Sequence, residues 1–341
     1  MSMNKIKLSA RWILLIVLVP ICIIVFAMLL PNIVRTTNLD VPPVSFVQKE
    51  YEQTFTPNSA FKMLFVGDVM LARSIGTQIQ EGDNPFKNIK STFDKYELIV
   101  ANLETVAAKD DYAFQNPNKL YTFNAPVSTL DLLTQNGVDI VSLANNHTMD
   151  YGSAALIDTI KNVKDRGVLY FGAGNNIQEA FEPKYVAFNK TRIALLAFND
   201  IENWVTDASD NTPGSANFDK DRIKQSLDQA KANSDIIIVF PHWGVEYALT
   251  NSDRQSEYAR YFIDNGADIV IGAHPHVLQN SEEYGGKMIY YSLGNFVFDD
   301  MCSIPNACNA GMVEVNIDNN KITSSNLIKV KISDNGFPEL E

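Results

Sequence analysis

The histidines of this chain all follow apolar runs, and this pattern limits the possible folds more than any other feature. The run Ala267-Asp268-Ile269-Val270-Ile271 leads directly into Gly272-Ala273-His274-Pro275-His276. The four histidines of the chain, each just beyond an apolar run, are His147, His242, His274 and His276. A short apolar run bounded by turn residues is typical of a strand buried on both faces. Since functional side chains in α/β sheets gather beyond the carboxyl ends of the strands, we expect the histidines to meet there.

Helical and strand patterns alternate through the body of the chain. The expected strands are Phe61–Val66, Glu97–Ala101, Val138–Leu143, Arg192–Phe198, Asp235–Phe240, Ala267–Ile271 and Met288–Leu293. The expected helices are Val127–Gln135, Ser153–Arg166, Asp219–Ala232 and Ser252–Asp264. Asn136-Gly137 and Asn265-Gly266 are helix C-cap signals, and each leads into a buried strand that ends in histidine. The alternation predicts an α/β fold, and residues 311–332 are typical of terminal hairpin strands.

The N-terminal segment predicts a membrane anchor. Residues 12–30 form an apolar stretch without a charge, interrupted only by Pro20, and about 20 such residues span a bilayer. Basic residues precede the stretch, so the positive-inside rule places the N-terminus in the cytoplasm and the remaining chain outside. A cleaved signal peptide is the alternative, which changes the anchoring but not the compartment. The expected organisation is a cytoplasmic segment over 1–11, a transmembrane signal anchor over 12–30, a stalk over 31–60 and a folded domain over 61–341.

The charge balance excludes one class of partner. The chain has a formal net charge of -12. Residues 1–35 contain four basic residues and no acid, so the remaining chain holds 24 basic and 40 acidic residues, a net charge of -16. A domain of this sign repels nucleic acid and other polyanions, except where bound cations reverse the local field. We therefore expect no nucleic-acid binding.

Two cysteines lie close together near the C-terminus. Cys302 and Cys308 are near enough in sequence to close a small loop. A disulfide suits an oxidising compartment, and two unrelated thiols are the alternative. Spacing alone does not establish the geometry that a disulfide needs, so the sequence leaves both possibilities open.

The polar side chains expected at the strand ends form a mixed oxygen and nitrogen ligand set. They are Asp68, Asn102, Glu104, Asn146, His147, His242, His274 and His276. Such a set suits Zn, Mn or Fe, and it contains more nitrogen than Mg or Ca usually select. With more than four candidates, two ions are possible, and Asp68 or Glu104 could bridge them. A metal centre of this kind lowers the pKa of bound water toward about 7.

Each candidate also has a structural alternative when it is taken singly. Asp68 could be a turn residue, the asparagines could cap helices, and a lone His147 could be a hydrogen-bonded structural histidine. His274 and His276 carry more weight, because alternation in an extended segment would place both on one side. The joint placement of every histidine beyond an apolar run favours the metal site.

Neighbouring residues are expected to support this site or to contact the substrate. They are Asn102, Arg73, Asp150, Trp243, Glu246 and Asn295. A ligating histidine usually donates its second N–H to a carboxylate or carbonyl, which gives an acid such as Asp150 a physical use. Arg73 is expected either to meet an anionic substrate or to form a surface salt bridge. Trp243 is expected either to line the site or to pack in the core.

Six groups of residues carry a resemblance to a known family. They are Val66-Gly67-Asp68-Val69-Met70-Leu71, Ala101-Asn102-Leu103-Glu104, Leu143-Ala144-Asn145-Asn146-His147 with Asp150-Tyr151-Gly152, His242-Trp243-Gly244 with Glu246-Tyr247, Gly272-Ala273-His274-Pro275-His276 and Ser292-Leu293-Gly294-Asn295-Phe296. In their order and spacing, from about Phe61 to Phe298, the chain resembles the capsule-synthesis family known as CapA or PgsA, which is associated with poly-γ-glutamate capsules. A membrane anchor is also what this resemblance implies.

The same motifs are similar to those of the calcineurin-like metallophosphoesterases. That resemblance implies a four-layer α/β/β/α sandwich with a dimetal centre. It matches Asp68 to the acid of D-x-H, Asn146-His147 to G-N-H, His242 to the lone later histidine, His274 and His276 to the G-H-x-H pair, and Asn102 to Glu104 to the region of the bridging acid. The chain departs from the pattern at Met70, where D-x-H has its histidine, at Asn145, where G-N-H has glycine, and at Pro275 inside the histidine pair.

These observations lead to two main hypotheses. The first is an anchored, extracytoplasmic, metal-dependent hydrolase or transferase that acts on poly-γ-glutamate or a related anionic cell-wall polymer. Its divalent transition metal, one or two ions of Mn, Zn or Fe, would be held by Asp68, Glu104, Asn146, His242, His274 and His276, with His147 and Asp68 as catalytic groups. The second is a non-catalytic subunit that organises polymer synthesis or export beside membrane synthase subunits. A generic metallophosphoesterase is a lesser alternative.

Overall fold

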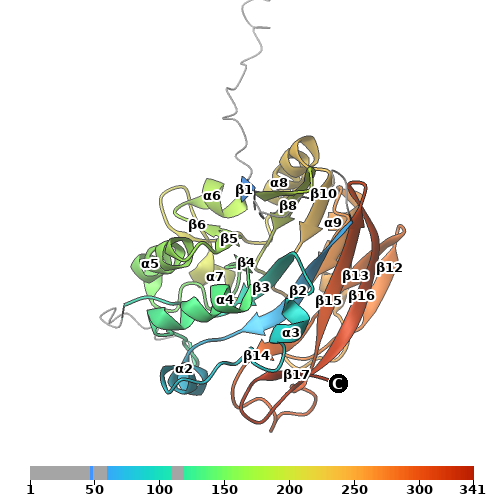
Figure 1. Cartoon of the computed structure of the whole chain (residues 1–341). Coiled ribbons are helices and arrows are strands. Elements are labelled where there is room, and N and C mark those ends of the chain that lie inside the picture. Colours follow the sequence, from blue (N-terminus) through green and yellow to red (C-terminus); the bar gives the residue numbers. More distant parts are fainter. Residues whose placement is uncertain (1–46, 49–59, 110–118) are drawn as a thin grey trace, which may run out of the picture. The chain divides into compact units, whose positions relative to one another are not determined.

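Two β-sheets form the centre of the computed structural model, which describes residues 47–48, 60–109 and 119–341 (Figure 1). In these ranges, a seven-stranded sheet runs in the order β1 (Val47–Gln48), β7 (Lys184–Phe188), β8 (Thr191–Leu196), β10 (Ile236–Val239), β11 (Ile269–Ile271), β13 (Lys287–Tyr290) and β12 (Ser281–Tyr284). An eight-stranded sheet runs β17 (Pro338–Leu340), β16 (Lys321–Ile332), β15 (Asn309–Asp318), β2 (Phe61–Val69), β3 (Leu98–Leu103), β4 (Ile140–Ser142) and β5 (Leu169–Phe171), with β14 (Asn295–Val297) also paired to β2. A short ribbon pairs β6 (Ala173–Gly174) with β9 (Gly214–Ser215).

Each sheet has a parallel centre. β2, β3, β4 and β5 pair in parallel, as do β8, β10, β11 and β13. Antiparallel strands extend both sheets outward, and the longest of these pairs is the β15–β16 hairpin. Parallel strands need helical crossovers, so this pairing follows from the alternation of helices and strands along the chain.

Helices cover the outer faces. On the β2 side they are α2 (Arg73–Gln80), α3 (Lys90–Phe93), η1 (Val127–Leu130), α4 (Asp131–Asn136) and α5 (Gly152–Asp165). On the β10 side α8 (Lys220–Asn233) lies on β8 and β10, and α9 (Asp253–Asp264) lies on β11. The remaining short helices are α6 (Ile177–Phe181) and α7 (Asn203–Thr206).

Strand β2 shows how the layers are held together. Met63 and Phe65 pack between the two sheets, in one apolar cluster with Ile193 of β8. Leu64 and Val66 point the opposite way, into a second cluster under the helices. A strand buried on both faces must be apolar at successive positions, which is the pattern that the sequence carries. The α/β prediction is therefore confirmed, with the layers in the order helices, sheet, sheet, helices.

The helix-end signals in the sequence are confirmed. Gly137 ends α4 in the left-handed conformation, with φ 89°, which only glycine adopts without strain. At the start of α9, Ser252 and Gln255 cap each other's backbone N–H groups. The sequence patterns did not indicate several shorter elements, among them α2, β5, β7 and β12.

The predicted N-terminal organisation falls largely outside the described residues. The expected anchor over 12–30 lies there entirely, and of the expected stalk the structure describes only Ala60 and β1, which pairs in parallel with β7. Among the described residues, no helix is both long and apolar enough to cross a membrane. The question about the cysteines has an answer: Cys302 and Cys308 form a disulfide.

A close backbone contact joins β2 to the segment before β14. The backbone N–H of Asp68 donates to the Gly294 carbonyl at 3.1 Å. A Cβ added at Gly67 would lie 1.9 Å from the same oxygen, far inside van der Waals contact. Gly67 is therefore required for the packing that brings Asp68 to the strand ends, rather than for an unusual backbone angle.

We expect Gly67→Ala to lower the free energy of unfolding by about 3 kcal/mol, because backbone on both sides resists the added methyl group. Gly167→Ala is a matched control: its φ is 74° and no described atom lies within 4 Å of the added Cβ, so only the strain of a left-handed alanine, about 1 kcal/mol, remains. Urea unfolding of both variants measures the difference. Equal midpoints would contradict the steric role of Gly67.

Candidate metal centre

The candidate ligands meet where the parallel strands of both sheets end. Asp68 and Asn102 lie at the ends of β2 and β3, and Glu104 follows β3 by one residue. The other sheet contributes histidines from the segments after β10 and β11. The buried members of this cluster are Asp68, Asn102, Glu104, Asn146, His147, His242, His274 and His276. The expected convergence of the histidines is therefore what the structure has.

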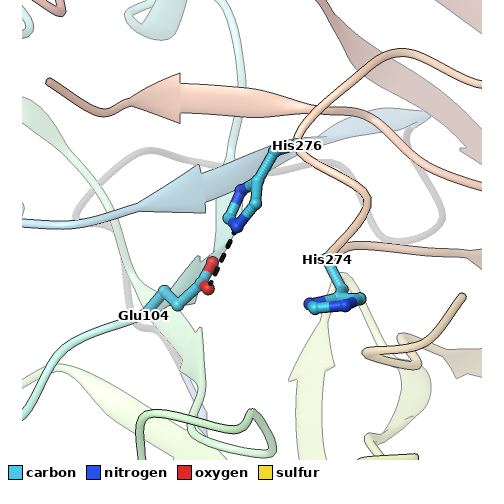
Figure 2. Close-up of side chains that lie close together, drawn as sticks. All are labelled: Glu104, His274 and His276. Atoms are coloured by element: carbon cyan, nitrogen blue, oxygen red, sulfur yellow. Dashed lines mark ion pairs between the residues drawn. The ribbon is translucent and has the colours of Figure 1, made fainter. Parts of the chain in front are cut away.

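The Glu104 carboxylate lies at the centre. Its Oε1 is 3.7 Å from His147 Nε2, 3.8 Å from His276 Nε2 and 4.0 Å from His242 Nε2. Figure 2 shows the carboxylate directed at the His276 ring, with His274 beside it. Neither carboxylate oxygen has a hydrogen-bond partner in the described part of the chain, and the same holds for Nδ1 of His274. Unpaired polar atoms of this kind are rare in native interiors and call for an explanation.

The spacing of these atoms fits a divalent cation. Glu104, His274 and His276 each offer a ligand atom, and these atoms lie within 4.8 Å of one another. Asp68, Glu104 and His242 form a second such set. Ligands about 2.0–2.2 Å from one ion lie within roughly 4.4 Å of each other, so both sets are compact enough after small adjustments. Because Glu104 belongs to both, it is the one carboxylate in the described residues placed to serve two ions.

The protonation states suit metal binding. Burial lowers the pKa of His242 and of His274 well below the usual 6.5, and the neighbouring imidazoles add to the effect. Both rings are therefore neutral at pH 7, which is the form that binds a metal. Burial, together with the charge of Asp68, raises the pKa of Glu104 well above its usual value. A cation next to Glu104 would oppose this shift, since it favours the ionised form.

Amide side chains connect the ligands to one another. Asn102 Nδ2 donates to Asp68 Oδ1 at 2.8 Å and lies 3.2 Å from Nδ1 of His242. The other ring nitrogen of His242 is 2.9 Å from Asn146 Oδ1. Asn145 Nδ2 in turn donates to Asn102 Oδ1 at 3.1 Å. Asp68 and Asn145 therefore restrict the orientation of the Asn102 amide, and Asn102 and Asn146 restrict the orientation of the His242 ring.

His147 belongs to a separate hydrogen-bonded group at the edge of the cluster. Its Nδ1 is 2.7 Å from Asp150 Oδ2, and its ring stacks on the Phe123 ring with a distance of 4.1 Å between the ring centres. Lys119 Nζ donates to Asp150 Oδ1 at 2.6 Å and also pairs with Glu202 at 3.1 Å. Burial lowers the pKa of His147, although Asp150 opposes the shift. Asp150 therefore orients a neutral ring whose Nε2 faces Glu104.

The segment that carries His274 and His276 is not extended, which corrects the alternation expected for it. Both residues have positive φ, 100° and 58°, where a side chain other than glycine is strained by about 1–3 kcal/mol. The backbone N–H of His274 lies 3.3 Å from Asp68 Oδ2, and the Pro275 carbonyl accepts from Tyr247 N–H at 2.8 Å. A turn held at both ends, rather than strand alternation, directs both rings to Glu104.

A pocket of about 340 Å³ opens onto the cluster. Its walls include Asn146, His147 and His276, together with Tyr247 and Lys119. The pocket therefore opens on the side of the cluster where His147 lies.

The expected neighbouring residues have different surroundings. Arg73 lines the pocket but forms ion pairs with Asp299 at 2.8 Å and Asp300 at 2.9 Å. Glu246 is an exposed residue of the pocket wall. Trp243 lies apart from the pocket: it is fully buried, and its Nε1 donates to the Tyr291 carbonyl at 2.8 Å. The structure therefore gives Trp243 the packing role that the sequence left as an alternative.

Two residues of the site were not predicted from the sequence. Lys119 lies outside the expected helices and strands, and only the structure brings its ammonium group to Asp150. Asn145 was noted solely as a departure from a motif, yet its amide holds Asn102. Met70 does not replace the missing histidine, because its buried Sδ accepts from the Ala72 N–H at 3.1 Å.

Residues 62–300 match the family model described as bacterial capsule synthesis protein PGA_cap. The chain belongs to this family. It is 34% identical over 249 residues to "Capsule biosynthesis protein CapA" of Bacillus anthracis, a match covering 71% of this chain and 61% of that one. It is 34% identical over 239 residues to "PGA biosynthesis protein CapA" of Bacillus subtilis (strain 168), covering 69% and 62%. The match thus spans about three fifths of the length of both relatives, and the resemblance to CapA read from the motifs is confirmed.

Two solved structures are similar to this chain at low sequence identity. A hypothetical protein from Thermus thermophilus is similar over 79% of this chain and 99% of that one, with a TM-score of 0.50 and 15% identity. The calcineurin-like phosphoesterase YfkN from Bacillus subtilis is similar over 83% and 94%, with a TM-score of 0.47 and 14% identity. The Thermus protein shows a shared fold and nothing about activity.

In metal-free protein, we expect Glu104→Gln to raise the free energy of unfolding at pH 8. The folded-state pKa of Glu104 is raised, so the ionised carboxylate destabilises the fold at high pH, whereas glutamine stays neutral. As pH falls, the folded state takes up a proton before the unfolded state does, so the advantage of the variant shrinks. It vanishes near the ordinary value of 4.5, where both states are protonated.

Urea unfolding in the presence of a chelator, from pH 5 to pH 8, measures this dependence. Glu81→Gln is the control, because the Glu81 side chain is exposed at the end of α2 and is not among the groups that raise the pKa of Glu104. A constant difference between Glu104→Gln and wild type at all pH values would contradict the buried charge.

Proposed function

We propose that this protein is a membrane-anchored, metal-dependent hydrolase or transferase of poly-γ-glutamate capsule synthesis, acting outside the cytoplasm on a γ-glutamyl or related envelope polymer. One observation supports the metal centre above all: the fully buried Glu104 carboxylate lies among imidazole rings, and it lacks any hydrogen bond in the described residues. The names of the two Bacillus relatives support the capsule role.

The ligand assignment follows from the two compact sets. Glu104, His274 and His276 would hold one cation, and Glu104 with Asp68 and His242 would hold a second. Asn146, whose amide oxygen lies beside His242, would add a neutral oxygen ligand. Nitrogen and oxygen donors without thiolate favour Mn, Zn or Fe. When bound, such an ion supplies hydroxide near neutral pH and polarises the bond under attack.

His147 is the proposed proton-transfer group. The Oδ2 atom of Asp150 is hydrogen-bonded to Nδ1 of His147 at 2.7 Å, so Nε2 of the ring faces Glu104 and the pocket. The pKa of His147 is lowered by burial, so Nε2 is unprotonated at pH 7 and accepts a proton from the attacking group. A general-acid role for His147 would need the charged ring, which this environment disfavours.

Lys119 completes the proposed proton-transfer group. Its ammonium group contacts Asp150 and Glu202 while its side chain is only 4% exposed. It neutralises a buried carboxylate that would otherwise carry an uncompensated charge beside His147. The ion pair holds the Asp150 carboxyl group in place beside Nδ1 of His147, which keeps the ring oriented.

One observation favours the rival function of a non-catalytic subunit. Met70 stands where the metallophosphoesterase motif has a ligating histidine, and its sulfur is turned to the Ala72 backbone. One of the two proposed cation sites therefore has fewer ligands than that motif would supply. A protein that organises synthase subunits needs no complete second site.

Replacing His274 and His276 with alanine separates these functions. Even outer-shell changes cost about 10–100-fold in metal affinity, so loss of two ligands should weaken binding by more than about 100-fold. Elemental analysis of the purified full-length chain measures bound metal, and capsule polymer is measured in cells. Loss of both, with the variant folded and still in the membrane, supports catalysis.

Two other outcomes decide against catalysis. Polymer that persists after the metal is lost supports the scaffold, and wild-type protein without any transition metal contradicts the metal centre. Gln279→Ala is the control. The Gln279 side chain is buried near the same turn, but it contacts Gln255 and backbone carbonyls rather than the cluster. Its loss should leave the amount of bound metal unchanged.

The proposed anchor is tested through the disulfide. Val19→Arg with Ile24→Arg places two charges in the apolar stretch, each costing about 2.5–3.5 kcal/mol at a bilayer centre. We expect the variant to stay in the cytoplasm with Cys302 and Cys308 reduced, since that compartment keeps thiols free. Maleimide labelling in cells reports the thiols, and Val19→Leu with Ile24→Leu is the control. Oxidised cysteines in the arginine variant would count against export through this segment.

A further inference from the structure

Asn295 connects the metal centre to a different part of the fold. It is fully buried in β14, directly opposite Asp68 in the pairing with β2. Its Nδ2 donates to the His276 carbonyl and to the Ala307 carbonyl, both at 3.0 Å. Its Oδ1 lies 2.9 Å from His276 Nδ1.

These contacts determine which way the amide faces. Two carbonyl oxygens can only accept hydrogen bonds, so the NH2 group of Asn295 must point at them. The amide oxygen of Asn295 therefore faces His276. Since this oxygen can only accept a hydrogen bond, the ring proton of His276 lies on Nδ1. Nε2 of His276 is left with a lone pair on the side of Glu104, 3.8 Å from its carboxylate. A fixed outer partner is what orients a histidine for a cation.

The Ala307 carbonyl is held by a covalently closed segment. Cys302 and Cys308 are joined six residues apart, and Ala307 is fully buried just before the second cysteine. Within the loop, Ala307 N–H donates to the Ile304 carbonyl at 3.2 Å. On the far side, the Cys308 carbonyl accepts from Ile332 N–H of β16 at 2.9 Å. The disulfide thus restricts the Ala307 carbonyl, which is connected through the Asn295 amide to the proposed ligand His276.

We infer that Asn295 and the disulfide-closed segment Cys302–Cys308 together position His276, so that breaking the disulfide weakens cation binding at the strand ends. This inference rests on the proposed metal centre. Without the crosslink, the segment around Ala307 gains freedom, and the Asn295 amide keeps only the His276 carbonyl of the two acceptors that determine its orientation. His276 then loses its fixed outer partner, although no ligand has been removed.

The consequence is a centre whose affinity depends on its compartment. Disulfides of this kind persist where the surroundings are oxidising and are reduced in a cytoplasm. A newly made chain would hold its metal weakly until the crosslink forms. Full affinity would then coincide with arrival at the place where the polymer is handled.

The test is metal binding by the full-length chain, read as the visible spectrum and dissociation constant of Co²⁺. We expect Asn295→Ala to weaken binding by about 10–100-fold, the range for outer-shell partners. Cys302→Ser with Cys308→Ser, or reduction of the wild-type disulfide, should weaken it in the same direction. Reoxidation of the reduced protein should restore it. Circular dichroism checks that each protein is folded.

A double-mutant cycle distinguishes positioning from general stability. If the disulfide acts through Asn295, the cysteine changes should add nothing in the Asn295→Ala background. Asn136→Ala is the matched control: this buried amide, bonded to the Leu132 carbonyl and to Asn84, contacts no cluster residue. Its loss should lower thermal stability and leave the Co²⁺ constant unchanged.

The outcomes are separable from those of the proposed function. Wild-type protein that binds no Co²⁺ overturns the metal centre and this inference with it. Normal wild-type binding, with cysteine variants of unchanged affinity, overturns this inference alone. Equal losses from the cysteine changes in wild type and in Asn295→Ala would also overturn it, because the effect would not pass through the amide.

Discussion

Glu104 leaves β3 where the strands of both sheets end, and its carboxylate lies among imidazoles with no hydrogen-bond donor in the described chain. An ionised carboxylate removed from water costs several kcal/mol unless a partner balances it. The raised pKa of Glu104 expresses that cost. His242 and His274 beside it are neutral at pH 7 and supply no positive charge. A divalent cation would satisfy the carboxylate and the unpaired ring nitrogen of His274 together.

This constraint explains why the ligands come from two sheets. A single sheet offers a row of side chains along one edge, whereas Glu104 is surrounded. The eight-stranded sheet contributes the carboxylates and His147, and the segments after β10 and β11 contribute His242, His274 and His276. The close approach of Gly67 to Gly294 brings β2 against the chain that leads into β14, and thereby Asp68 next to Asn295. The strained backbone at His274 and His276 is a further local cost of this convergence.

The composition of the site was predictable because buried parallel strands leave few places for polar residues. Asp68, Glu104 and the four histidines stand out against apolar runs, and strand ends of one sheet share an edge. The turn that aims His274 and His276 was not predictable, since positive φ at a histidine has no pattern in sequence. Lys119 was missed for a related reason: it lies in an irregular segment, and its partner Asp150 is determined only by the fold.

The charges of the pocket give the proposed cation a second role. Arg73 and Lys119 are the cations of the described pocket wall, and each is already paired with two carboxylates. Neither offers a free charge to a polyanion, and the chain as a whole is acidic. An anionic polymer would therefore be repelled from the metal-free pocket. One or two divalent ions at Glu104 would make the electrostatic potential positive at the strand ends, while the surrounding surface stays negative. The same ions that activate the reaction would then attract the substrate, so polymer binding and catalysis would be lost together when the metal is removed.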